Sequence, residues 1–92
     1  MVANYDLGSF SDDLKVLINS LFAEVCSILE NKSMSKDRRD FFTRRIKMLS
    51  ADFSFRMKRE SSGEGDLVGF VDEYIKIGSS LWTIKKDLLA MK

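Results

Sequence analysis

Few side chains in this 92-residue chain could do catalytic chemistry. The chain has no histidine, so the commonest general base and the commonest metal ligand are both missing. The adjacent carboxylates Asp12-Asp13 and Asp72-Glu73 do not form a catalytic pair, because neighbours in sequence point about 100° apart on a helix. There is no glycine-rich phosphate loop and no metal-ligand spacing. We therefore expect a non-catalytic protein without a metal or a cofactor.

Cys26 is the only cysteine, which excludes an intramolecular disulfide. The chain therefore gives no sign of an oxidising compartment, and we expect Cys26 to be a small buried or half-buried filler. Residues 1–31 lack the basic start and apolar core of a secretory signal. No apolar run approaches the ~20 residues needed to span a bilayer. These features predict a cytoplasmic protein with no membrane span.

Basic residues are concentrated in the segment 36–60. It holds nine Lys and Arg against four Asp and Glu, a net charge of +5, whereas residues 1–31 carry −4 and residues 61–92 carry −1. A rigid basic helix matches the phosphate backbone of a nucleic acid, so we predict nucleic-acid binding here. The candidate binding residues are Arg38, Arg39, Arg44, Arg45, Lys47, Arg56, Lys58 and Arg59.

A row of apolar residues lies among these cations. Phe41, Met48 and Phe55 follow at intervals of seven residues and therefore share one face of a helix. That face points away from the expected inward stripe, which consists of Phe42, Ile46, Leu49, Phe53 and Met57. Because a monomer has no need of a second apolar row, we predict that it forms an interface with a second copy or with another partner.

Three helices are predicted to position these residues, over about 11–30, 36–60 and 66–91. Each has a side chain suited to capping its first turn, namely Ser11, Ser35 and Asp66, with Ser9 as an alternative to Ser11. The first helix carries an apolar stripe at intervals of three and four residues from Leu14 to Ile28. The small, glycine-rich segment 61–65 reads as a linker.

The third range has the most regular apolar pattern in the chain, alternating intervals of three and four residues from Leu67 to Met91. Tyr74 and Trp82 lie within its broad apolar arc, so both are expected in the core. We expect the helix to continue through Gly78. Together the ranges predict one domain over residues 1–92. Its fold class is all-α, an elongated up-down-up three-helix bundle paired into a homodimer.

Two interpretations of the basic helix remain open. The layout resembles small dimeric viral RNA-binding modules, such as the RNA-binding domain of the influenza non-structural protein and the nodaviral silencing suppressors. That resemblance implies paired helical units that hold an RNA duplex on basic helices. The alternative is a protein-interaction adaptor, chaperone or regulator. Its basic helix would dock on an acidic protein surface, with the apolar row at the centre.

Overall fold

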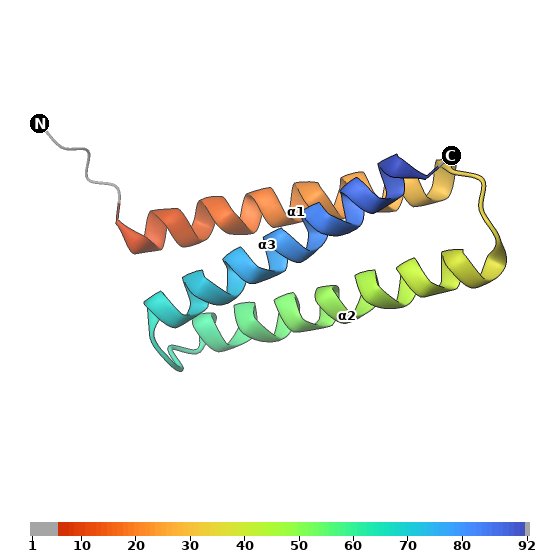
Figure 1. The fold of residues 1–92 in the computed structure, drawn as a ribbon. Helices are drawn as coiled ribbons and strands as arrows, with labels where there is room; N and C mark the ends of the chain where they lie inside the picture. Colours follow the sequence, from red (N-terminus) through yellow and green to blue (C-terminus); the bar gives the residue numbers. More distant parts are fainter. Residues whose placement is uncertain (1–5, 92) are drawn as a thin grey trace, which may run out of the picture.

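The computed structural model describes residues 6–91, which form three α-helices. They are α1 (Leu7–Asn31), α2 (Lys36–Ser61) and α3 (Leu67–Ala90), and the described residues form no strand. α1 and α3 run in one direction and α2 in the other (Figure 1), so the predicted all-α helical bundle is confirmed. The radius of gyration is 15.2 Å, against about 12 Å for a compact chain of this length. The bundle is therefore elongated.

A side chain caps the first turn of each helix. Ser35 and Asp66, both predicted caps, accept hydrogen bonds from the backbone N–H groups of Arg38 (3.3 Å) and Gly69 (2.6 Å). The predicted start of the first helix at Ser11 is wrong, because α1 begins at Leu7. There the Asp6 carboxylate accepts a hydrogen bond from the Ser9 N–H at 2.9 Å, which satisfies a free donor one turn earlier than expected.

Two glycines shape the turn between α2 and α3. Gly63 and Gly65 have φ angles of +76° and +72°, in the left-handed region that favours glycine. α3 then runs without a break from Leu67 to Ala90, so the expected continuation through Gly78 is confirmed. The turn places the first half of α3 against the last turns of α2 (Figure 1).

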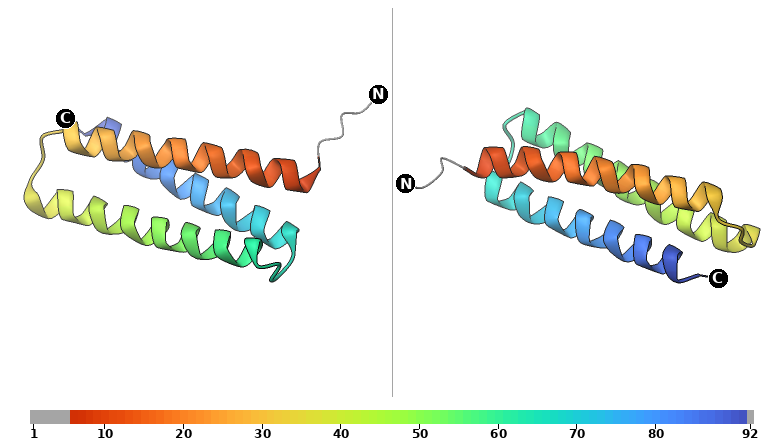
Figure 2. Two further views of the ribbon diagram at one scale, coloured as in Figure 1. Left: turned by 180° about the vertical axis from the view of Figure 1, so that it is seen from behind. Right: turned by 90° about the horizontal axis from the view of Figure 1, so that it is seen from above.

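The core lies along α3, which packs most extensively on α1, less on α2, and leaves little contact between α1 and α2 (Figure 2). Phe53 of α2 is where the three helices meet. Its ring centroid is 6.0 Å from that of Phe22 in α1 and 5.7 Å from that of Tyr74 in α3, the latter pair edge to face. α2 is therefore anchored through a small part of its surface, and most of it faces outward.

Two expectations about buried residues are wrong. Trp82 is 50% exposed, although Tyr74 on the same helix is fully buried as predicted. The apolar arc of α3 is wider than the two neighbouring helices of one chain can cover, so its edge remains on the surface. Cys26 is exposed on α1 rather than packed as a filler. None of the helices in residues 6–91 is long and apolar enough to cross a membrane.

Candidate nucleic-acid interface

α2 has two apolar sides. The inward residues Phe42, Ile46 and Phe53 are only 3–7% exposed, and Leu49 and Met57 pack partly buried beside them. The outward residues Phe41, Met48 and Phe55 are 49%, 73% and 55% exposed. The second apolar row is therefore on the surface of the monomer and is not absorbed by its own core.

Two arginines lie against the rings of this row. The guanidinium carbon of Arg45 is 5.6 Å from the centroid of the Phe41 ring, and that of Arg59 is 5.8 Å from the Phe55 ring. Both pairs are four residues apart on the helix, where side chains are neighbours. Such cation–π contacts are favourable. The row is therefore a mixed surface of rings, one thioether and cations.

Three of the eight candidate cations form ion pairs with carboxylates or bind the carbonyl groups at the end of α1. Arg39 donates hydrogen bonds to the carbonyl oxygens of Leu29 and Lys32, at 2.5 and 2.7 Å, and so satisfies the free end of α1. The other two form ion pairs: Arg56 with Asp52 (3.1 Å) and Glu73 (3.6 Å), and Arg59 with Glu64 (3.3 Å). These three side chains already have a role in holding the fold.

The other five candidates form no ion pair with a carboxylate of residues 6–91; they are Arg38, Arg44, Arg45, Lys47 and Lys58. Arg44 donates one hydrogen bond, to the backbone oxygen of Asp40 at 3.4 Å.

Lys36, which was not among the candidates, is also exposed and has no such ion pair. Lys36, Lys47 and Lys58 follow at intervals of eleven residues, or three helical turns, so they form one line about 33 Å long. We call this line the lysine row.

A polar cluster that the sequence did not reveal joins the three helices at one end of the bundle. The Glu60 carboxylate, at the end of α2, accepts hydrogen bonds from Ser11 Oγ (2.9 Å), Lys15 Nζ (3.0 Å) and the Tyr74 hydroxyl (2.8 Å). Burial opposes ionisation of Glu60, but these three donors outweigh it and lower the pKa of the carboxyl below its ordinary value.

The donors of this cluster respond to the same carboxylate. Burial, and then the charged Glu60 acceptor, raise the pKa of Tyr74 far above its ordinary value. Burial works against a charged Lys15, yet its contacts with Glu60 and Asp12 leave the pKa of the ammonium raised. Every group of the cluster is engaged with another, so its role is to hold the helices together. Sequence spacing gave no signal for it, because Ser11 and Lys15 are 49 and 45 residues away from Glu60.

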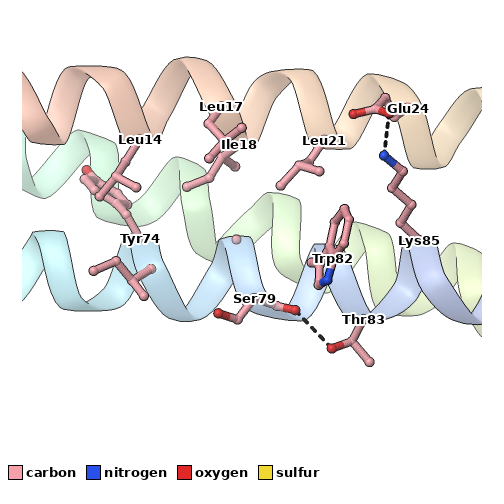
Figure 3. A pocket seen from close by; sticks show the side chains of 12 residues that line it. Leu14, Leu17, Ile18, Leu21, Glu24, Tyr74, Ser79, Trp82, Thr83 and Lys85 are labelled. Carbon is pink, nitrogen blue, oxygen red and sulfur yellow. Dashed lines mark hydrogen bonds and ion pairs between the residues drawn. The ribbon is translucent and has the colours of Figure 1, made fainter.

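A second exposed apolar surface lies between α1 and α3 (Figure 3). It is a groove of about 560 Å³, with Leu17, Ile75 and the ring of Trp82 on its walls. Gly78 adds no side chain to it. An ion pair of 2.7 Å between Glu24 and Lys85 stands at one edge. The sequence did not predict this groove because Trp82 was assigned to the core.

Within residues 6–91 no group of three or more Cys, Asp or Glu side chains could hold a metal ion. Comparisons with protein-family models, curated proteins and solved structures gave no match. The surface of α2 and the α1–α3 groove are therefore the two features from which a function can be argued.

Proposed function

We propose that this protein is a non-catalytic module that binds nucleic acid through α2, with a preference for double-stranded RNA, and that it acts as a pair of chains. The observation that carries the proposal is the lysine row: Lys36, Lys47 and Lys58 are exposed on α2 and form no ion pair with a carboxylate of residues 6–91. A charged side chain on a helix ordinarily gains from a neighbour of opposite sign. Cations left without one are available to phosphates, whose neutralisation releases counterions.

The shape of the basic surface favours a duplex over a single strand. The lysine row runs along a helix of the bundle for about 33 Å and is not carried on a loop, so its charges are held in a fixed line. Exposed Ser50 and Ser54 add hydroxyl donors. Duplex RNA is recognised largely by shape, through phosphate and 2′-hydroxyl contacts. Base stacking is not required of Phe41 and Phe55 in this proposal.

Removal of two of the three charges of the lysine row tests the proposal. The variant Lys47→Ala with Lys58→Ala should weaken binding to a short RNA duplex by about tenfold or more at low salt. The matched control is Lys76→Ala with Lys86→Ala on α3, which removes the same charge from another helix and should change the affinity less than about twofold. Equal losses in both variants would mean that only net charge matters and would contradict a site on α2.

A second candidate function is a protein-interaction adaptor, and the α1–α3 groove favours it. An exposed Trp82 above an apolar floor is the kind of anchor that protein interfaces use. Trp82 is the only tryptophan, so its fluorescence reports on the groove. In the proposed function, RNA leaves its emission unchanged while binding to α2. If a polyglutamate chain binds as tightly as RNA at equal charge, an acidic protein partner becomes the better assignment.

A further inference from the structure

The residues on the outward side of α2 are arranged nearly symmetrically about Met48. Nine residues of this helix lie within about 60° of Met48 on a helical wheel. We call them the outward strip: Asp37, Phe41, Arg44, Arg45, Met48, Ala51, Asp52, Phe55 and Arg59. All are exposed or half-exposed, and Met48, at the centre, is the most exposed of the large apolar residues in the described part of the chain.

Residues equally far from Met48 in the two directions match in size or oppose in charge. Seven positions away, Phe41 corresponds to Phe55. Four positions away, Arg44 corresponds to Asp52, and eleven positions away Asp37 corresponds to Arg59. The remaining pair sets the long side chain of Arg45 against the small Ala51. Such a strip is complementary to a second copy of itself that runs in the opposite direction.

We propose that two chains pair through α2 in antiparallel orientation, with the twofold axis at Met48. Met48 then contacts Met48 of the second copy, and each Phe41 ring packs on the other Phe55 ring. Each Asp52 lies between Arg44 and Arg45 of the second copy, and each Asp37 lies next to the other Arg59. Asp52 keeps its ion pair with Arg56, and Arg59 keeps its ion pair with Glu64, because a carboxylate and a guanidinium each have sites for more than one partner. The half-exposed rings and thioether are thereby removed from water, which supplies the driving force.

The charges decide the orientation. A parallel pair in register would set Arg44 and Arg45 against the same arginines of the second copy, and Asp52 against Asp52. Like charges placed together in an interface suppress that arrangement. The antiparallel pair replaces each of these repulsions by an attraction, although α2 as a whole is strongly basic.

The pairing also determines where the lysine rows of the two chains lie in the dimer. This row lies on the side of α2 turned away from the inward residues, to one side of the outward strip. A twofold axis perpendicular to both helices leaves the two rows on the same side of the pair, with Lys47 of each chain nearest the axis. This inference rests on the pairing that belongs to the proposed function, and it adds the orientation and the register.

Cross-linking tests the orientation. In a Cys26→Ser background, Met48→Cys should form a disulfide-linked dimer under mild oxidation, because both copies meet at the axis. Phe41→Cys alone should stay unlinked, since its two copies are about 21 Å apart along the pair. Mixing Phe41→Cys chains with Phe55→Cys chains should restore linkage. Efficient self-linkage of Phe41→Cys would indicate a parallel pair and overturn the inference.

Charge reversal tests the register without touching the apolar residues. Arg44→Asp sets the new carboxylate against Asp52 of the second copy, and Asp52→Arg sets the new guanidinium against Arg44 of the second copy. Each should weaken the dimer about tenfold in sedimentation equilibrium, because two pairs change from attraction to repulsion. The double variant carries both changes in one chain and should recover most of the loss. If the loss of dimer stability in the double variant equals the sum of the losses in the two single variants, the proposed register is wrong.

Control variants separate this inference from the proposed ligand. Trp82→Glu in the α1–α3 groove should leave the dimer intact, and circular dichroism should show full helix content in every variant. Dissociation by Trp82→Glu, with no effect of charge reversal on α2, would overturn the inference. If the dimer shows the predicted cross-links but binds no RNA, the proposed RNA ligand is wrong and the pairing stands. If the chain binds RNA while it stays monomeric, the pairing is wrong and the proposed ligand stands.

Discussion

The Tyr74 hydroxyl donates a hydrogen bond of 2.8 Å to Glu60 Oε1 and so fastens α3 to the last turn of α2. Ser11 and Lys15 of α1 donate to the same carboxylate. Ser11 and Tyr74 are themselves fully buried. One carboxylate therefore satisfies donors from two other helices, and it fixes the end of α2 without using the outward strip or the lysine row.

Removal of this carboxylate should destabilise the bundle. Glu60→Ala leaves the buried hydroxyls of Ser11 and Tyr74 without an acceptor, so we expect the free energy of unfolding to fall by about 2–3 kcal/mol. Urea unfolding followed by circular dichroism measures the loss. Glu64→Ala is the control, because its ion pair with Arg59 is largely exposed and should be worth less than about 1 kcal/mol. Similar losses in both variants would contradict the role assigned to Glu60.

The same cluster predicts how stability depends on pH. The pKa of Glu60 is lower in the folded chain than its ordinary value of 4.5, so the unfolded chain binds more protons near that pH. The stabilisation is fully present above about pH 4.5 and is lost as the pH falls through the folded pKa. Glu60→Gln should flatten this acid limb in urea unfolding between about pH 6 and pH 3. If the stability of Glu60→Gln falls with decreasing pH as steeply as that of the wild-type protein, the acid dependence belongs to other carboxyl groups.

Arg39 should matter for stability more than for binding. Arg39→Ala removes two hydrogen bonds to the end of α1 and should lower the free energy of unfolding by about 1–2 kcal/mol. Arg39→Lys should recover only part, since one ammonium does not reproduce the planar guanidinium fork. Arg38→Ala, which breaks no ion pair within residues 6–91, should change stability by less than about 0.5 kcal/mol. A stable Arg39→Ala protein with impaired RNA binding would instead place Arg39 in the binding site, as the sequence suggested.

A substitution in the groove should stabilise the protein. A Cβ added at Gly78 would meet only Ile18 Cγ1, at an ordinary contact distance of 3.9 Å. Because glycine in a helix interior costs about 0.5–1 kcal/mol relative to alanine, Gly78→Ala should raise the free energy of unfolding by a similar amount. Gly63→Ala provides the opposite control, since its positive φ makes the change unfavourable. A loss of stability in Gly78→Ala would show that this position needs its glycine.

The sequence predicted those features that depend on near neighbours. The caps at Ser35 and Asp66 and the two apolar sides of α2 are set by residues within a few helical turns, so their spacing is visible in the chain. The Glu60 cluster was not predictable, because its donors come from distant helices. Trp82 was misplaced for a related reason. The width of the apolar arc on a helix does not show how much of that arc the neighbouring helices cover. Arg39 could not be told apart from the other cations of the basic segment by sequence, because its carbonyl partners lie on another helix and in the loop that follows it.

We propose that α2 presents a basic surface for nucleic acid in addition to the side that packs in the core. The most direct measurement is the dissociation constant for a short RNA duplex, determined by fluorescence anisotropy from about 50 to 200 mM salt. We predict binding that weakens steeply, with a log–log slope corresponding to about four or more phosphate contacts per dimer. A flat salt dependence, or no binding at about 50 mM salt, would contradict the account.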